Sequence, residues 1–242
     1  MLYRATELIG YPAVRALFRP EVTGLEHVVR RGAAIFAANH LSAADQVFTP
    51  VAARRQVVYF AKAEYFGQPG LRGRCVARLF REFGHVPVER DSIRAAASTI
   101  DIGTRLLADG KALGIYPEGT RSPDGRLYRF RTGVARLALR SGAPVIPVAL
   151  IGTDQLQLAG YGRWHRRPVA VHFGPALDFS GRRDDERSSS ALREVTESVR
   201  AAIQQLSGQR YIDCYANTIK EAQRPSAPRA TAHPGPARDA HT

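Results

Sequence analysis

The sequence predicts an α/β fold with a mostly parallel central sheet flanked by helices, and three observations support that prediction. Short segments rich in Val, Ile and Ala alternate with longer segments of helical periodicity, which is typical of a parallel sheet covered on both faces. The chain has 242 residues, 44% of them apolar, which suffices for one domain with a sizeable core. Polar motifs directly follow several predicted strands, at the sheet edge where ligands bind in such folds.

The expected elements follow in order along the chain. Apolar residues on one side of residues 2–18 predict a short helix. Strands are expected at residues 22–29, 33–38, 57–61, 85–88, 112–116, 145–151 and 168–173. Helices are expected at residues 43–54, 71–83, 92–108, 132–140 and 189–206. We expect Asp91 to cap the start of the helix at 92–108, and Gly110 and Gly142 to end helices.

The chain divides into three expected parts. Residues 1–20 form an N-terminal helical segment, which either packs on the core or lies in a lipid interface. Arg4, Glu7 and Arg15 interrupt that segment, so no signal peptide is predicted. Residues 21–207 form the main domain, in which no run approaches the roughly 20 apolar residues of a membrane span. Residues 208–242 are Pro/Ala-rich and are expected to be a disordered tail.

The charge of the chain favours anionic partners. It has 35 Lys and Arg residues against 22 Asp and Glu residues, a net charge of +13. Nucleic acid, acidic headgroups and phosphorylated substrates are all compatible with that charge. Cys75 and Cys214 lie far apart without CxxC spacing, and His165 and His172 have no ligand spacing, so neither a disulfide framework nor a metal site is expected.

The stretch NHLSAAD, residues 39–45, places a histidine just after a predicted strand. Asp45 falls in the first turn of the following helix, so its carboxylate can return to one nitrogen of His40. Asp45 would then fix the tautomer, and the other imidazole nitrogen would be free as a general base. The spacing alone leaves open a second reading, in which the pair caps a helix and has no chemical role.

Three further motifs follow in order: GHVPVERD, YPEGTRSPDG and APVIPVALIG. Together with NHxxxxD they resemble the four sequence blocks of the glycerolipid acyltransferase family, of the lysophosphatidic acid acyltransferase (1-acylglycerol-3-phosphate acyltransferase) type. The resemblance covers roughly residues 20–180 and implies the glycerolipid acyltransferase fold. Residues 21–207 are therefore expected to be an acyltransferase domain.

The resemblance implies a reaction. A fatty acyl group passes from an acyl-CoA or acyl-carrier-protein thioester to the hydroxyl of lysophosphatidic acid, and phosphatidic acid forms. In the family the hydroxyl attacks directly, with His40 as base and Asp45 orienting it, and no acyl-enzyme forms. The lack of a GxSxG motif agrees with that mechanism. No cofactor is expected besides the donor substrate; another lysolipid or a glycolipid is the alternative acceptor.

The same resemblance assigns Arg90 and Arg121 to the acceptor, and the planar guanidinium group suits a phosphate. Gly119 would let the backbone approach the acceptor, and Glu118 would orient Arg121 or a glycerol hydroxyl. Arg131 precedes a helix, whose N-terminus also favours an anion. The expected acceptor-phosphate and substrate-binding residues are Lys62, Arg90, Glu118, Gly119, Thr120, Arg121 and Arg131.

A lysophospholipid partitions into bilayers, so we expect a cytoplasmic protein that is peripheral on the inner face of the cell membrane. Two interpretations from other classes compete with this one. A basic nucleic-acid-binding protein would explain the charge, but no nucleic-acid-binding motif occurs and nucleic acid is not expected as a partner. A non-catalytic membrane-binding module would leave His40 and Asp45 without a role.

Overall fold

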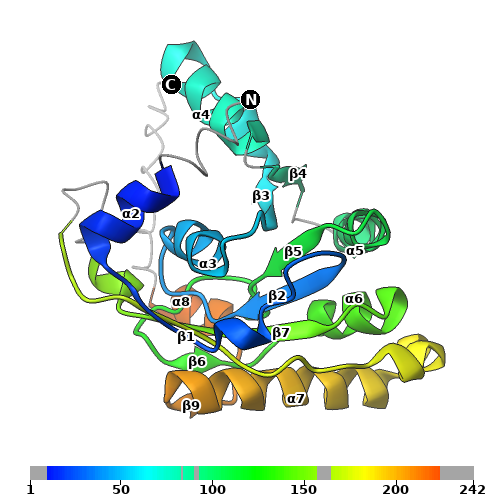
Figure 1. The fold of residues 1–242 in the computed structure, drawn as a ribbon. Helices are drawn as coiled ribbons and strands as arrows, with labels where there is room; N and C mark the ends of the chain where they lie inside the picture. Colours follow the sequence, from blue (N-terminus) through cyan, green and yellow to red (C-terminus); the bar gives the residue numbers. More distant parts are fainter. Residues whose placement is uncertain (1–9, 83, 90–92, 157–164, 224–242) are drawn as a thin grey trace, which may run out of the picture.

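The computed structural model describes residues 10–82, 84–89, 93–156 and 165–223 (Figure 1). Seven strands form one sheet in the order β1-β8-β7-β2-β5-β3-β4. Only the pair β7–β8 is antiparallel, which confirms the predicted, mostly parallel α/β fold. The strands are β1 (Glu21–Thr23), β2 (Ala34–Ala38), β3 (Val58–Lys62), β4 (Val86–Val88), β5 (Ala112–Ile115), β7 (Val145–Ile151) and β8 (Ala170–Phe173).

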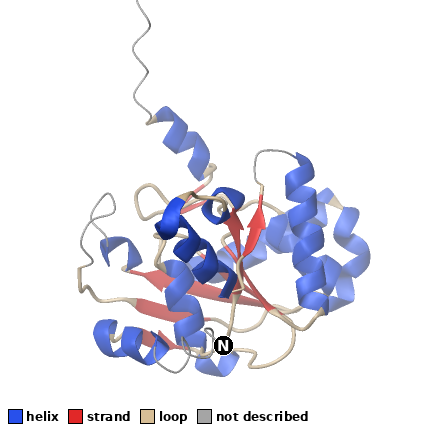
Figure 2. Cartoon of the chain, turned by 90° about the horizontal axis from the view of Figure 1, so that it is seen from above, coloured by secondary structure: helices blue, strands red, loops and turns tan. Residues whose placement is uncertain are grey.

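Helices cover both faces of the sheet (Figure 1), and the view from above shows the helices that lie over one of these faces (Figure 2). The larger helices are α2 (Tyr11–Phe18), α3 (Asp45–Ala53), α4 (Gly70–Glu82), α5 (Ile93–Ala108), α6 (Gly133–Ser141) and α7 (Ser189–Ser207). Short 3₁₀ turns are η2 (Leu25–His27), η3 (Ala63–Phe66), η4 (Thr153–Leu156) and η5 (Ser180–Arg187). A second, two-stranded sheet joins β6 (Leu127–Tyr128) to β9 (Tyr211–Ile212), and α8 (Ala216–Ala222) follows.

The central strand β2 separates two hydrophobic layers, since side chains alternate between the two faces of a strand. Phe36 packs in the layer under α2 and α3, together with Phe48. Ile35 faces the opposite layer, where it packs with Leu137 of α6 and Val199 of α7 (Figure 1). All five residues of β2 are buried, as expected for a parallel strand covered on both faces.

The N-terminal helix packs on the core. The rings of Phe18 in α2 and Phe48 in α3 meet edge to face at 5.6 Å, whereas Leu17 is 57% exposed. Packing is therefore confirmed for this part of the helix, and residues 1–9 lie outside the described residues. None of the described helices has the length and apolar character needed to span a bilayer.

Two predictions about the elements are wrong. The strand expected at residues 22–29 ends at Thr23, because Gly24 turns the chain at φ 72° into η2. A side chain at Gly24 would place its Cβ 1.9 Å from the carbonyl oxygen of Phe173, so only glycine fits there. The tail expected from residue 208 is ordered up to residue 223, since β9 pairs with β6 and α8 follows. The Pro/Ala-rich residues 224–242 and the cap Asp91 lie outside the described residues.

Candidate active site

Two loops far apart in the sequence meet at the carboxyl ends of the central strands. His40 follows β2 and Glu118 follows β5, and these two strands are parallel neighbours. The backbone N–H of His40 donates to Glu118 Oε1 at 3.1 Å, and the backbone N–H of Ser122 donates to the carbonyl oxygen of His40 at 2.7 Å. The sheet thus brings the NHxxxxD and EGTRS motifs into one site, at the edge that the sequence predicts.

The predicted pair of His40 and Asp45 is in contact. His40 Nδ1 lies 2.8 Å from Asp45 Oδ2, which also accepts the backbone N–H groups of Leu41 (2.7 Å) and Ser42 (2.9 Å). The hydroxyl of Thr153 donates to Asp45 Oδ1 at 2.5 Å. Asp45 is fully buried, so these donors replace the water that its charge loses. The carboxylate is fixed before any substrate arrives.

This geometry assigns the tautomer of His40. An ionised carboxylate only accepts hydrogen bonds, so Nδ1 of the imidazole carries the proton toward Asp45. In the neutral ring Nε2 then has a free lone pair and can accept a proton. The side chain of His40 is 14% exposed, whereas that of Asp45 is 0% exposed, so only the imidazole reaches solvent. The arrangement suits a general base. The solvent exposure of the imidazole is not needed in the alternative interpretation, in which the pair only caps a helix.

An aromatic stack fixes the plane of the imidazole. The ring of Tyr116 lies 3.9 Å from that of His40 at an angle of 11°, and the ring of Tyr59 stacks on that of Tyr116 at 5.4 Å. Ring contacts and the Asp45 bond together restrict rotation of His40. The sequence interpretation missed Tyr116, although this residue directly precedes the PEGTRS stretch at a strand end.

Asn39, the first residue of the NHxxxxD motif, has a structural role that the sequence interpretation also missed. Its buried side-chain amide donates to the carbonyl oxygen of Leu150 at 2.9 Å and accepts the N–H of Leu150 at 2.7 Å. The amide thus continues the ladder between β2 and β7 past the end of β2. It also donates to Gln209 Oε1 at 2.9 Å, a contact with the segment after α7.

Glu118 joins the two loops. Its Oε1 accepts from the N–H of His40 and its Oε2 accepts from the N–H of Tyr128 at 3.1 Å. The side chain is almost fully buried, and burial raises the pKa of this carboxyl to about 7, although the two backbone N–H groups act to lower it. The expected contact with Arg121 is not among the hydrogen bonds of the described residues. Glu118 therefore orients backbone rather than Arg121.

Positive charge gathers at the EGTRS loop. Lys220 Nζ donates to Thr120 Oγ1 at 2.8 Å, and the pKa of Lys220 is lowered first by burial and then by the positive charge of Arg121. Gly119 has φ +76°, and a Cβ there would lie 2.9 Å from Arg131 Nε, so the backbone and this guanidinium are in close contact. Neither Arg121 nor Arg131 forms an ion pair with a carboxylate of the described residues.

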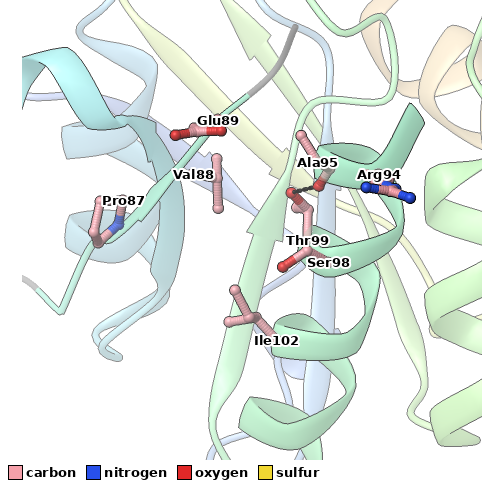
Figure 3. Close-up of a pocket in the computed structure, with 8 residues that line it drawn as sticks. All are labelled: Pro87, Val88, Glu89, Arg94, Ala95, Ser98, Thr99 and Ile102. Carbon is pink, nitrogen blue, oxygen red and sulfur yellow. Dashed lines mark hydrogen bonds between the residues drawn. The ribbon is translucent and has the colours of Figure 1, made fainter. Parts of the chain in front are cut away.

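Of the two remaining predicted residues, the structure describes only Lys62. Lys62 ends β3 at the same edge, with its side chain 48% exposed and 4.0 Å from Glu64. Arg90 lies outside the described residues. The strand β4 before it borders a cavity of about 420 Å³ against α5 (Figure 3). The lining residues are Pro87, Val88, Glu89, Arg94, Ala95, Ser98, Thr99 and Ile102.

Within the described ranges, no group of three or more His, Cys, Asp and Glu residues could hold a metal ion.

Comparison with known proteins gives consistent matches. A family model described as Acyltransferase matches residues 19–151, more than half of the 242 residues. A 1-acyl-sn-glycerol-3-phosphate acyltransferase from Limnanthes alba is 33% identical over 159 residues, which cover 65% of this chain and 54% of the relative. A protein of the same name from Borreliella burgdorferi is 29% identical over 157 residues, covering 65% and 61%. The chain thus spans less than two thirds of the length of these curated relatives.

A solved structure agrees with the sequence matches. The crystal structure of the 1-acyl-sn-glycerophosphate (LPA) acyltransferase PlsC from Thermotoga maritima has a TM-score of 0.60 and 27% sequence identity. The match covers 84% of this chain and 79% of that chain, so it extends well beyond the motif loops. The sequence motifs, the sheet and the match to the family model together show that the chain belongs to the acyltransferase family.

Proposed function

We propose that the chain transfers a fatty acyl group from an acyl-CoA or acyl-carrier-protein thioester to the free hydroxyl of lysophosphatidic acid. The product is phosphatidic acid, an intermediate of phospholipid biosynthesis. One observation carries the proposal: His40, bonded to Asp45 at 2.8 Å, stands beside a loop whose arginine has no carboxylate partner among the described residues. The names of the similar proteins support the same activity.

In the proposed reaction Nε2 of His40 removes the proton of the acceptor hydroxyl as the oxygen attacks the thioester carbonyl carbon. The new carbon–oxygen bond forms first, and the carbon–sulfur bond breaks when the tetrahedral intermediate collapses. The imidazolium then returns the proton to the leaving thiolate. Asp45 stays ionised and stabilises the imidazolium through Nδ1. No acyl-enzyme forms, and no cofactor is required besides the acyl donor.

The acceptor phosphate is proposed to bind at the EGTRS loop. Arg121 and Arg131 carry guanidinium groups that can make paired, charge-assisted contacts with phosphate oxygens. Gly119 leaves space for the guanidinium group of Arg131 beside the loop, because a Cβ at position 119 would meet this side chain. Lys62, at the end of β3, and Arg90 remain proposed phosphate contacts. A phosphate-bearing acceptor suits these cations better than a neutral glycolipid does.

We further propose that the protein docks on the inner face of the cell membrane from the cytoplasm, through α2. An apolar groove of about 250 Å³ between α2 and α3 is lined by Val14, Leu17, Phe18, Ala44, Val47 and Phe48. Leu17 and Val47 are 57% and 42% exposed, and Ala44 directly precedes Asp45. An apolar surface that includes the neighbour of Asp45 suits a lipid acceptor that leaves the bilayer only in part.

The proposed activity is tested with the purified chain, a panel of acceptors and both thioester classes. Thioester consumption is followed with lysophosphatidic acid, other lysophospholipids and a monoacylglycolipid. We expect the highest kcat/KM for lysophosphatidic acid. Equal rates with acceptors that lack a phosphate would contradict the proposed substrate, and no consumption with any acceptor would contradict the proposed activity.

A further inference from the structure

The segment after α7 folds back along the EGTRS loop (Figure 1). β9 pairs in parallel with β6, which places Tyr211 beside Leu127. Two further backbone bonds extend the pairing, from Leu127 N–H to the carbonyl oxygen of Arg210 (3.1 Å) and from Arg129 N–H to that of Cys214 (3.0 Å). The segment lies beyond residues 19–151, so the family match says nothing about it.

Three side chains of this segment contact the site. Gln209 accepts from Asn39 at 2.9 Å, next to His40 in the sequence. The ring of Tyr215 lies under the guanidinium of Arg131, at 5.1 Å from the ring centre. Lys220 donates to Thr120 at 2.8 Å. A segment that only covered apolar surface would not need to place polar and aromatic side chains on both catalytic loops.

Lys220 is a cation with spare donors. An ammonium group has three N–H donors, and Thr120 takes only one of them. No carboxylate of the described residues lies within 4.0 Å of its Nζ. Glu118 is near, but both of its oxygens accept backbone N–H groups. Lys220 is therefore held at the loop without an ion pair to any described carboxylate.

The neighbours of Lys220 make an anion favourable at this position. The side chain is half-buried, and its pKa is lowered first by burial and then by the positive charge of Arg121, against a smaller opposite effect of Glu118. Arg121 is exposed and follows Thr120 directly, so its positive charge and that of Lys220 share one side of the loop and repel each other. A phosphate between them would remove the repulsion and accept the remaining N–H donors of both groups.

We propose that Lys220 is a phosphate-binding, specificity-determining residue of the acceptor site, supplied by the C-terminal segment. The proposal rests on the proposed function, because it takes the phosphate to be that of the acceptor. Lys220 and Arg121 contact the same phosphate, and the hydroxyl of Thr120 holds the ammonium in place. Lys220 takes no part in proton transfer and acts only on binding and acceptor choice.

The test uses the full chain and a matched control. Lys220→Met removes the charge and keeps most of the side chain, while Lys111→Met changes an exposed lysine at the opposite, amino end of β5. Binding of sn-glycerol 3-phosphate is measured by calorimetry, without an acyl donor. Acyl transfer is then measured with lysophosphatidic acid and with monoacylglycerol, which lacks the phosphate.

For Lys220→Met we expect glycerol 3-phosphate affinity and kcat/KM for lysophosphatidic acid to fall roughly 10- to 100-fold, the usual effect of losing a hydrogen bond to a charged group. The loss lies in the KM for the acceptor, while the KM for the donor and the rate with monoacylglycerol stay unchanged. Lys220→Arg restores most of the binding, and Lys111→Met behaves like the wild type. Thr120→Val has a smaller effect, because it removes the support and not the charge.

The outcomes separate the two proposals. If the wild type binds glycerol 3-phosphate through Lys220 but transfers no acyl group, the phosphate site stands and the proposed function fails. If the wild type makes phosphatidic acid and Lys220→Met keeps the wild-type affinity and KM, the role of Lys220 is overturned and the function stands. The role of Lys220 would also be overturned if Lys220→Met lost activity equally with lysophosphatidic acid and with monoacylglycerol. The same holds if Lys220→Arg lost as much as Lys220→Met, because either result indicates that the lysine has only a structural role.

Discussion

Asp45→Asn tests whether the carboxylate supports catalysis through charge. The amide oxygen of asparagine can still accept the N–H groups of Leu41 and Ser42, and its NH₂ group can donate to the hydroxyl of Thr153. The fold is therefore expected to persist. The variant reverses the bond with Thr153, and its main loss is the charge beside the imidazolium, where a hydrogen bond to a charged group contributes about 1.5–3 kcal/mol.

That energy corresponds to a decline in kcat of roughly 10- to 100-fold, since 1.4 kcal/mol is a factor of ten. The KM for lysophosphatidic acid should stay within a factor of two of the wild type. The assay is steady-state acyl transfer at saturating donor, with thermal unfolding followed by circular dichroism. Asp45→Ala is the comparison: it leaves buried donors without an acceptor and lowers the unfolding temperature as well. A kcat for Asp45→Asn close to wild type would refute the charge argument.

Three further predictions follow from single residues. Gly119→Ala should weaken acceptor binding, because its Cβ would meet Arg131; an unchanged acceptor KM would contradict the close contact. Burial raises the pKa of Glu118 to about 7, so its carboxyl favours folding when protonated, and stability should fall as the pH rises from about 4.5 to 7. The free energy of unfolding should decline by up to about 3 kcal/mol over this range in the wild type and by less in Glu118→Gln. Urea unfolding measures it, and parallel pH profiles of the two proteins would contradict the prediction. Leu17→Ser should reduce co-sedimentation with anionic vesicles, and Ala16→Ser, also exposed on α2, should not; equal binding would exclude the groove.

The contact between His40 and Asp45 could be predicted from sequence because it is local. His40 and Asp45 are five residues apart across one strand-to-helix corner, so the pattern alone limits the geometry. Thr153 could not be found in this way, since its bond to Asp45 depends on how η4 is placed after β7. Parallel strands place the ends of β2 and β5 side by side, which explains why the EGTRS loop was correctly placed near His40.

The order of residues 208–223 could not be predicted from amino-acid composition. The Pro/Ala-rich stretch begins at about residue 224, and the short run before it has no helical or strand period long enough to detect. Its order comes from tertiary contacts: β9 pairs with only two residues of β6, and Lys220 reaches Thr120. The strand expected at residues 22–29 failed for a related reason, because Gly24 packs against the backbone of Phe173, far away in the sequence.

We propose that the imidazole of His40 deprotonates the hydroxyl of a phosphate-bearing lipid. The most direct measurement is mass spectrometry of the product formed from lysophosphatidic acid and a mixed pool of acyl thioesters, with the wild type and His40→Ala compared side by side. We expect phosphatidic acid from the wild type and none from a His40→Ala chain that retains its circular dichroism spectrum. Phosphatidic acid formed by His40→Ala at near wild-type rate would contradict it.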